Sequence, residues 1–72
     1  MDQELLAPLA GQVLSIKCAV GDTVEEDEEV VVIEALKMET PVFAPCDGTV
    51  KEIRVREGAS VEEDDVLILL ST

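Results

Sequence analysis

The sequence predicts a small all-β domain, and three observations indicate this fold class. Phe43 is the only aromatic residue, so the core must be assembled from many Val, Leu and Ile side chains, which suits β structure. These residues come in short runs separated by Gly, Pro and acidic residues. The chain also contains two copies of one pattern: residues 7–35 align with residues 44–72 at a constant offset of 37, and ten of the 29 pairs are identical. We therefore expect a single domain over residues 1–72, with residues 7–35 and 44–72 as similar halves.

The first two strands are expected at residues 4–7 and 12–18, with Pro8 ending the first of them. In the second strand the apolar positions are spaced by three residues and then by two, so strict alternation is broken once. The second copy repeats the same spacing, which predicts a β-bulge in each half. The residues concerned are Val13, Ile16 and Cys18, and their counterparts Val50, Ile53 and Val55.

Each half continues with a turn, an isolated valine, an acidic loop and a final strand. The turns are expected at Gly21 and Gly58, and the acidic loops at residues 25–29 and 62–65. Charge runs of this kind usually face water, so we interpret them as solvated loops and not as metal sites. Strands are expected at the short apolar runs that follow the loops, residues 30–33 and 66–70.

The segment that joins the two copies, Glu34-Ala35-Leu36-Lys37-Met38-Glu39, consists of good helix formers, and propensity alone predicts a helix there. A helix would have to begin directly after a strand and end before Pro41, within about two turns. We predict instead a β-hairpin with Leu36 and Lys37 at its tip.

This hairpin breaks two local rules. Tight hairpin turns favour Gly, Asn or Asp, because their central residues often need a positive φ angle, and none of these residues is present. Glu34 would also face Glu39 across the two strands, which places like charges opposite each other. Local rules tend to fail where function overrides them, so we expect the tip to be the functional site.

The composition excludes several classes of partner and location. A net charge of −12 argues against nucleic acid and anionic membranes, which need a basic surface, and it predicts a soluble monomer. The residues after Met1 carry no positive charge of the kind that begins a signal peptide, and the longest apolar run, residues 66–70, is too short to span a membrane. We expect a cytoplasmic protein without direct membrane insertion.

Catalytic side chains are scarce. The chain has no His, Tyr or Trp, and its serines have no base to activate them. The two cysteines, Cys18 and Cys46, stand at positions that are Val55 and Leu9 in the other copy, so we interpret them as packing residues and predict no metal site. The domain is therefore not expected to be an enzyme; it would take part in catalysis by carrying an attached group.

The joining segment resembles the biotinylation motif of biotin carboxyl carrier domains, whose usual core is Ala-Met-Lys-Met. The resemblance extends over nearly the whole chain, including the two Ala-Pro steps, Gly11, Gly21, Val24 and the Gly-x-Val-x-x-Ile-x-Val segment that begins at Gly48. It implies a flattened β-barrel of two four-stranded antiparallel sheets related by a pseudo-twofold axis. Lys37 would lie on an exposed hairpin, with the chain termini at the far end.

The resemblance also implies a function and a set of partners. A biotin protein ligase would join biotin to the Lys37 amine, and Glu34, Ala35, Leu36, Met38 and Glu39 would form the hairpin that it recognises. The biotin would then shuttle CO2 between a biotin carboxylase and a carboxyltransferase or decarboxylase acting on an acyl-CoA or an oxo acid. The sequence departs from the family pattern at Leu36, where methionine is usual, and at Asp27, where glycine is frequent.

Two alternatives remain open at this point. Lipoyl domains share the implied fold and present a lysine on the same hairpin, but they usually have Asp before the lysine and Ala or Ser after it. Leu36 and Met38 favour biotin over that alternative. The second alternative is a non-catalytic interaction module, such as the barrel-like domains of membrane-fusion adaptors, and a modification on Lys37 would distinguish the two classes.

Overall fold

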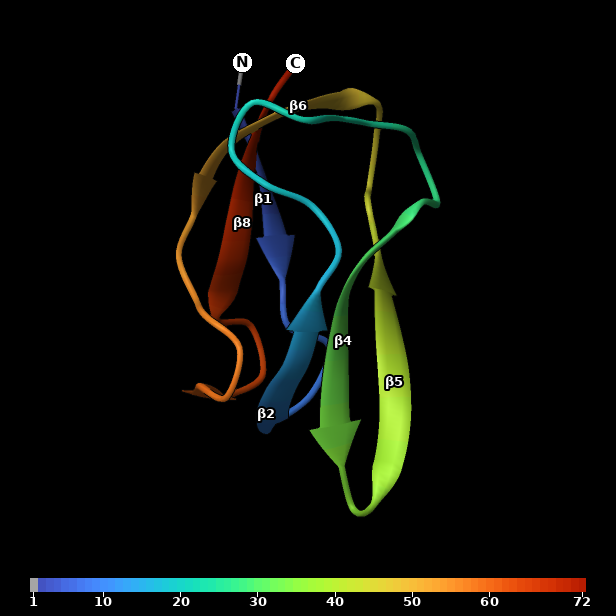
Figure 1. Cartoon of the computed structure of the whole chain (residues 1–72), viewed down its shortest axis with the longest axis vertical. Helices are drawn as coiled ribbons and strands as arrows, with labels where there is room; N and C mark the ends of the chain where they lie inside the picture. Colours follow the sequence, from blue (N-terminus) through green and yellow to red (C-terminus); the bar gives the residue numbers. More distant parts are fainter. Residues whose placement is uncertain (1) are drawn as a thin grey trace.

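The computed structural model describes residues 2–72, and within them every regular element is a β-strand (Figure 1). None of these residues belongs to a helix that could cross a membrane. The strands, in chain order, are β1 (Asp2–Leu6), β2 (Gly11–Ile16), β3 (Thr23–Val24), β4 (Glu29–Ala35), β5 (Met38–Phe43), β6 (Gly48–Ile53), β7 (Ser60–Val61) and β8 (Val66–Ser71).

The strands form two four-stranded antiparallel sheets, ordered β1-β8-β6-β3 and β5-β4-β2-β7. Adding 37 to the residue numbers of β4 and β2 gives β8 and β6, and subtracting 37 from those of β5 and β7 gives β1 and β3. Each sheet is therefore the counterpart of the other. The predicted fold, with its pseudo-twofold relation, is confirmed. The structural repeat also includes β1 and β5, which the sequence alignment of residues 7–35 and 44–72 did not contain.

Equivalent pairs of backbone hydrogen bonds connect the two halves. The Asp27 amide donates to the Ala44 carbonyl, and the Asp64 amide donates to the Ala7 carbonyl, both at 2.9 Å. In the reverse direction Ala44 donates to Glu28, and Ala7 donates to Asp65. The acidic loop of each half therefore holds the beginning of the other half. The Ala-Pro steps repeat in the sequence because both alanines are buried at these junctions.

The predicted bulges are present at equivalent places. The pairing of β2 with β4 shifts register between Val13 and Ser15, and the pairing of β6 with β8 shifts register between Val50 and Glu52. The extra residue is Leu14 in one copy and Lys51 in the other. Because a bulge sends two successive residues to the same side of the sheet, it accounts for the interrupted alternation in the sequence.

The core lies between the two sheets and is aliphatic. Val13, Val24, Val50 and Val61 are buried in it as equivalent pairs. The larger side chains that are also fully buried belong to β4 and β8, and they include Ile33, Leu67, Ile68 and Leu70.

Ile16 and Ile53, which share the spacing pattern of the buried valines, are only partly buried and pack against the core. Each is the last residue of its strand, so no further strand residue covers it. Cys18 and Val55 lie against the core in the same way, which agrees with an apolar packing role for Cys18.

Several strand boundaries also differ from the predicted ones. The first strand begins at Asp2 and ends at Leu6, because pairing with β8 extends to Ser71. The second strand ends at Ile16, two residues before its predicted end. The two-residue strands β3 and β7 were not predicted, since a lone valine carries no periodicity. Pro41 lies inside β5, which tolerates it because β5 is an edge strand.

Candidate functional site

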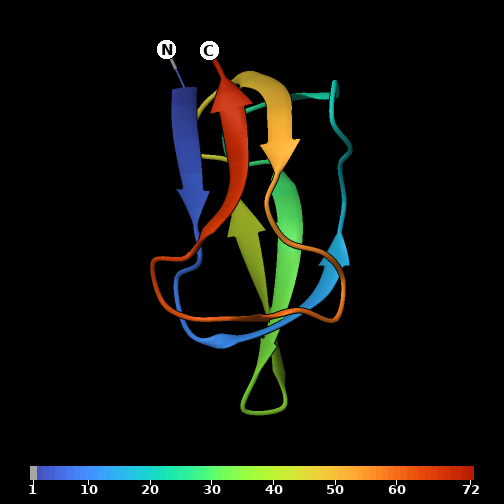
Figure 2. The ribbon, with the colours of Figure 1, turned by 90° about the vertical axis from the view of Figure 1, so that its left-hand side faces the viewer.

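Strands β4 and β5 form a hairpin that extends beyond the rest of the barrel, at the end opposite to the chain termini (Figures 1 and 2). The last strand pairs are Glu34 with Glu39 and Ala35 with Met38, which leaves Leu36 and Lys37 as the two residues of the turn. The helix that propensity alone favours does not form. The antiparallel hairpin that was predicted here is present.

The turn has an unusual backbone. Leu36 and Lys37 have φ angles of 53° and 64°, so both lie in the left-handed region. This is the φ pattern of a type I′ turn, for which Gly, Asn and Asp are the usual residues. A left-handed residue with a side chain costs on the order of 1–2 kcal/mol, and two successive ones occur at this turn. The rule violation seen in the sequence is therefore a real conformational cost of this turn.

The side chains around the turn are exposed to solvent. The Leu36 side chain is 93% exposed and that of Met38 is 69% exposed, so neither contributes much to the core. Lys37 is exposed as well, and among residues 2–72 its amine joins no hydrogen bond or salt bridge. The Lys37 amine is thus available to an enzyme approaching from outside. Glu34 and Glu39 are exposed one step behind the turn, and Ala35 is partly buried.

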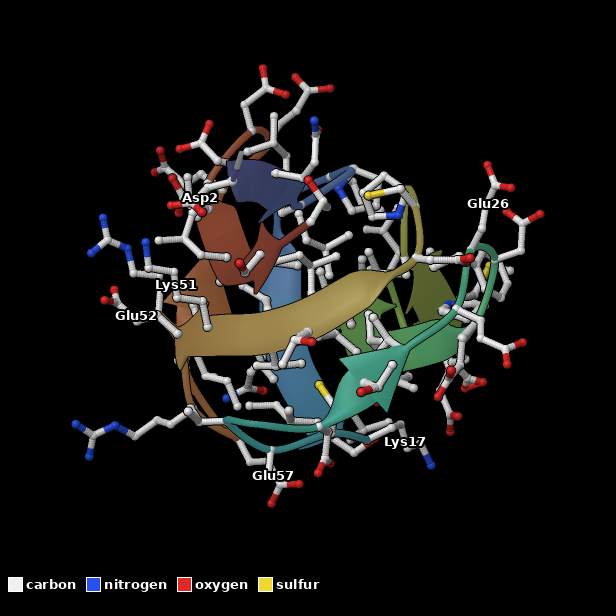
Figure 3. The ribbon with its side chains drawn as sticks, turned by 90° about the horizontal axis from the view of Figure 1, so that it is seen from above. Asp2, Lys17, Glu26, Lys51, Glu52 and Glu57 are labelled. Carbon is white, nitrogen blue, oxygen red and sulfur yellow. The ribbon has the colours of Figure 1, made fainter. Side chains whose placement is uncertain are left out.

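The salt bridges of the described residues lie on the other sheet. Lys51 contacts Asp2 at 2.7 Å, and Arg54 contacts Glu52 at 2.8 Å. Figure 3, viewed from above, shows Asp2, Lys51 and Glu52 gathered on one side of the barrel, outside β6 and β8. The hydrogen bond and the charge of Lys51 lower the pKa of Asp2, and the same contact raises the pKa of Lys51. These pairs stand apart from the hairpin.

The acidic side chains of the two loops have structural roles. In the acidic loops the Glu25 amide donates to the Glu28 carboxylate, and the Glu62 amide donates to the Asp65 carboxylate, so these acids hold their own turns. Across residues 2–72 there is no pocket and no group of three or more ligating side chains that could hold a metal ion.

Cys18 is a poor nucleophile in this setting. Burial raises the pKa of its thiol, and the nearby carboxylates of Asp22 and Glu28 raise it further. Since the thiolate is the reactive form, the environment suppresses its chemistry. Cys18 and Cys46 are both free thiols.

Comparison with known proteins shows the family. Residues 3–70 match the family model described as biotin-requiring enzyme. The chain belongs to this family. Domains of the family carry biotin covalently on a lysine, and the exposed Lys37 amine is a chemically suitable group for an amide bond to biotin. We refer to the chain below as a biotinyl domain.

Three known proteins are similar to this biotinyl domain. It is 54% identical over 37 residues to the 1.3S subunit of methylmalonyl-CoA carboxyltransferase from Propionibacterium freudenreichii subsp. shermanii, an alignment that covers 51% of this chain and 30% of that subunit. It superposes on the urea carboxylase of Kluyveromyces lactis with a TM-score of 0.92 at 32% identity, over 99% of this chain and 6% of that one. A single-chain, multi-domain long-chain acyl-CoA carboxylase gives a TM-score of 0.89 at 29% identity, over 94% of this chain and 7% of that one. The biotinyl domain thus matches only a small part of each relative.

Asp27, which stands where the family frequently has glycine, adopts a backbone conformation that favours glycine. Asp27 has a φ angle of 66°, and its equivalent Asp64 has one of 71°. Glycine adopts this conformation without strain, and Asp is among the residues that tolerate it best. The family pattern of glycine at this place is therefore consistent with the loop geometry seen here.

The strained turn leads to a prediction about stability. Leu36→Asn is expected to raise the free energy of unfolding by about 0.5–1 kcal/mol, because Asn tolerates the left-handed region and the exposed leucine loses no packing. Urea denaturation monitored by circular dichroism would measure the change. Met38→Asn, at an exposed apolar residue of ordinary strand conformation, is the control and should not stabilise the domain. A lower midpoint for Leu36→Asn would mean that the turn carries no strain.

Proposed function

We propose that this biotinyl domain is the carboxyl carrier component of a biotin-dependent carboxylase or decarboxylase, with Lys37 as the residue that receives biotin. The observation that carries the proposal is the position of Lys37 at the tip of a projecting hairpin, with an unpaired and exposed amine. Lys17 and Lys51 are the only other lysines in the chain, and Lys51 is held by Asp2.

The chain's own residues contribute attachment and display. The Lys37 amine must lose its proton before it can form an amide. No side chain among residues 2–72 hydrogen-bonds to this amine, so we propose that the ligase supplies the base. The two-stranded support of β4 and β5 holds the amine away from the barrel wall. Bound biotin supplies a ureido nitrogen that carries a carboxyl group. The rigid barrel keeps the lysine at a fixed place in the assembly, which maintains a high effective concentration at each partner active site.

The proposed partners are a biotin protein ligase, a biotin carboxylase, and a carboxyltransferase or decarboxylase acting on an acyl-CoA or an oxo acid. The carboxyltransferase and carboxylase names of the three similar proteins support this set. We propose further that the biotinyl domain is monomeric, is located in the cytoplasm and has no catalytic residue of its own. Its strong negative charge supports solubility and discourages self-association.

The intact mass of the protein tests this proposal against the lipoyl alternative. The domain is co-expressed with a biotin protein ligase in cells that also hold a lipoyl-attaching enzyme, and it is then weighed by mass spectrometry. We expect one added biotin, located on the peptide that contains Lys37. A lipoyl mass, or an unmodified protein in the presence of active ligase, would contradict the proposed function.

A further inference from the structure

Gly11 and Gly48 are the first residues of β2 and β6, and the 37-residue offset makes them equivalent. Neither has a positive φ angle, so their backbone conformation does not require glycine. The space around Gly11 does require it. A β-carbon at Gly11 would lie 2.6 Å from the carbonyl oxygen of Glu34 and 2.7 Å from Cγ2 of Ile33. Carbon atoms in contact stay about 3.5–4.0 Å apart, so a side chain at position 11 would push β2 and β4 apart.

The backbone that Gly11 approaches is the root of the Lys37 hairpin. Gln12 pairs with Glu34, and a β-carbon at Gly11 would lie 3.3 Å from that of Ala35, the residue that precedes the turn. In Figure 1 the beginning of β2 lies beside the end of β4, and the tip of the hairpin projects beyond both. Gly11 is thus the outermost residue of β2 that supports the hairpin from the side.

Within the described sheet, β2 is the only strand that holds the hairpin laterally. The sheet order β5-β4-β2-β7 makes β5 an edge strand, so β4 alone connects the hairpin to the rest of the sheet. Ile33 is fully buried in the core, whereas Glu34, the next residue of β4, is exposed. Beyond Ile33 the direction of the hairpin therefore depends on the contact between β4 and Gly11.

Strand β2 is held from its other side, so a side chain at position 11 would displace β4 and not β2. The Gly58 amide donates to the Val13 carbonyl at 2.7 Å, and the Val13 amide donates to the Ala59 carbonyl at 2.8 Å. The side-chain amide of Gln12 also donates to the Gly58 carbonyl, at 3.0 Å. A clash at Gly11 is therefore relieved by moving β4, whose outer neighbour is the edge strand β5.

The equivalent close approach at Gly48 involves another part of the molecule. A β-carbon there would lie 2.9 Å from the carbonyl oxygen of Ser71 and 3.3 Å from Cγ2 of Thr72, at the end of β8. This end of β8 lies beside the chain termini, opposite to the hairpin (Figure 2). The repeat thus provides two equivalent close approaches, and only that of Gly11 involves the strand that leads to Lys37.

We infer that Gly11 is a positioning residue for Lys37, and this inference rests on the proposed function. Because position 11 has no side chain, β4 packs directly against β2 and the hairpin projects from the barrel in one fixed direction. Amide formation requires the amine to lie at a near-attack distance from the carboxyl carbon of biotin, and misplacement by about 1 Å can lower a rate about a hundredfold. A ligase bound to the domain therefore meets the Lys37 amine in a productive position only while β4 keeps its contact with Gly11.

The test compares Gly11→Ala with Gly48→Ala, which adds the same methyl group at the equivalent position. Both variants are assayed with a purified biotin protein ligase at a temperature at which circular dichroism shows them to be fully folded, so that a loss of stability does not alter the rates. We expect kcat of Gly11→Ala to fall about tenfold with KM within about threefold, and both constants of Gly48→Ala to stay within about twofold of the wild type. Equal kinetic constants for the two variants would overturn the inference.

Residual dipolar couplings of the backbone amides report the direction of the hairpin and need no ligase. In the wild type and in Gly48→Ala, the alignment fitted to the barrel should also reproduce the couplings of residues 34–39. In Gly11→Ala these residues should require a different orientation from the barrel. An unchanged orientation of the hairpin in Gly11→Ala would overturn the inference. The proposed function fails separately, if Lys37→Arg still gains biotin, and the couplings are unaffected by that outcome.

A measurement on the wild type decides the question if Gly11→Ala does not fold. Amide relaxation gives order parameters for the hairpin strands, which should equal those of β2 at about 0.85, the value of a rigid backbone. Order parameters below about 0.6 at Glu34 and Ala35 would show that the hairpin has no fixed direction, and they would overturn the inference.

Discussion

Lys37→Arg is expected to give a folded, soluble domain that gains no biotin. Arginine keeps the positive charge and can occupy the same exposed position, but its guanidinium does not replace the primary amine that forms the amide. The side chain has no packing or hydrogen-bond partner to lose, so the free energy of unfolding should change by no more than about 0.5 kcal/mol. Intact mass after co-expression with a ligase measures the first effect, and urea denaturation measures the second.

Lys17→Arg and Lys51→Arg are the matched controls. Both should be biotinylated like the wild type, since Arg54 already occupies the counterpart of Lys17 and an arginine at position 51 can still reach Asp2. Biotin on Lys37→Arg would refute the assignment of Lys37. Loss of biotin in either control would instead show that a second lysine is needed.

Ile33→Ala is expected to lower the free energy of unfolding by about 2–5 kcal/mol, as large-to-small substitutions in cores do. The Ile33 side chain is fully buried in β4, directly behind the hairpin, and it closely approaches the backbone at Gly11. Stabilities of about 0.05–0.15 kcal/mol per residue are usual, so the loss is a large share of the total for 72 residues. Urea denaturation of the purified domain measures it.

Ile16→Ala is the informative comparison, because Ile16 is chemically the same residue but only partly buried. Its truncation should cost about half as much or less, since fewer contacts and a smaller cavity are involved. Leu70→Ala, at the counterpart of Ile33, should resemble Ile33→Ala. Equal effects for Ile16→Ala and Ile33→Ala would mean that the ends of the barrel are as tightly packed as its centre.

The amino-acid sequence by itself determined the fold class, the repeat and the position of the hairpin. These features depend on local signals: short aliphatic runs, turn glycines, and a spacing of three and then two residues that recurs at Val13 and Val50. The position of Lys37 at the hairpin tip was predictable for the same reason, because this residue lies between the two copies in a segment that must reverse direction before Pro41. A one-dimensional pattern contains this information without any knowledge of contacts.

Only the tertiary structure decided which apolar residues are buried and which way the others face. Ile16 and Ile53 share the pattern of the buried valines, but they end their strands, and burial depends on what lies beyond a strand's last residue. The short strands β3 and β7 exist because β6 and β2 pair with them. The side of the sheet that Leu14 and Lys51 face could not be predicted, because each bulge changes the parity of its strand and the outcome follows from cross-strand register.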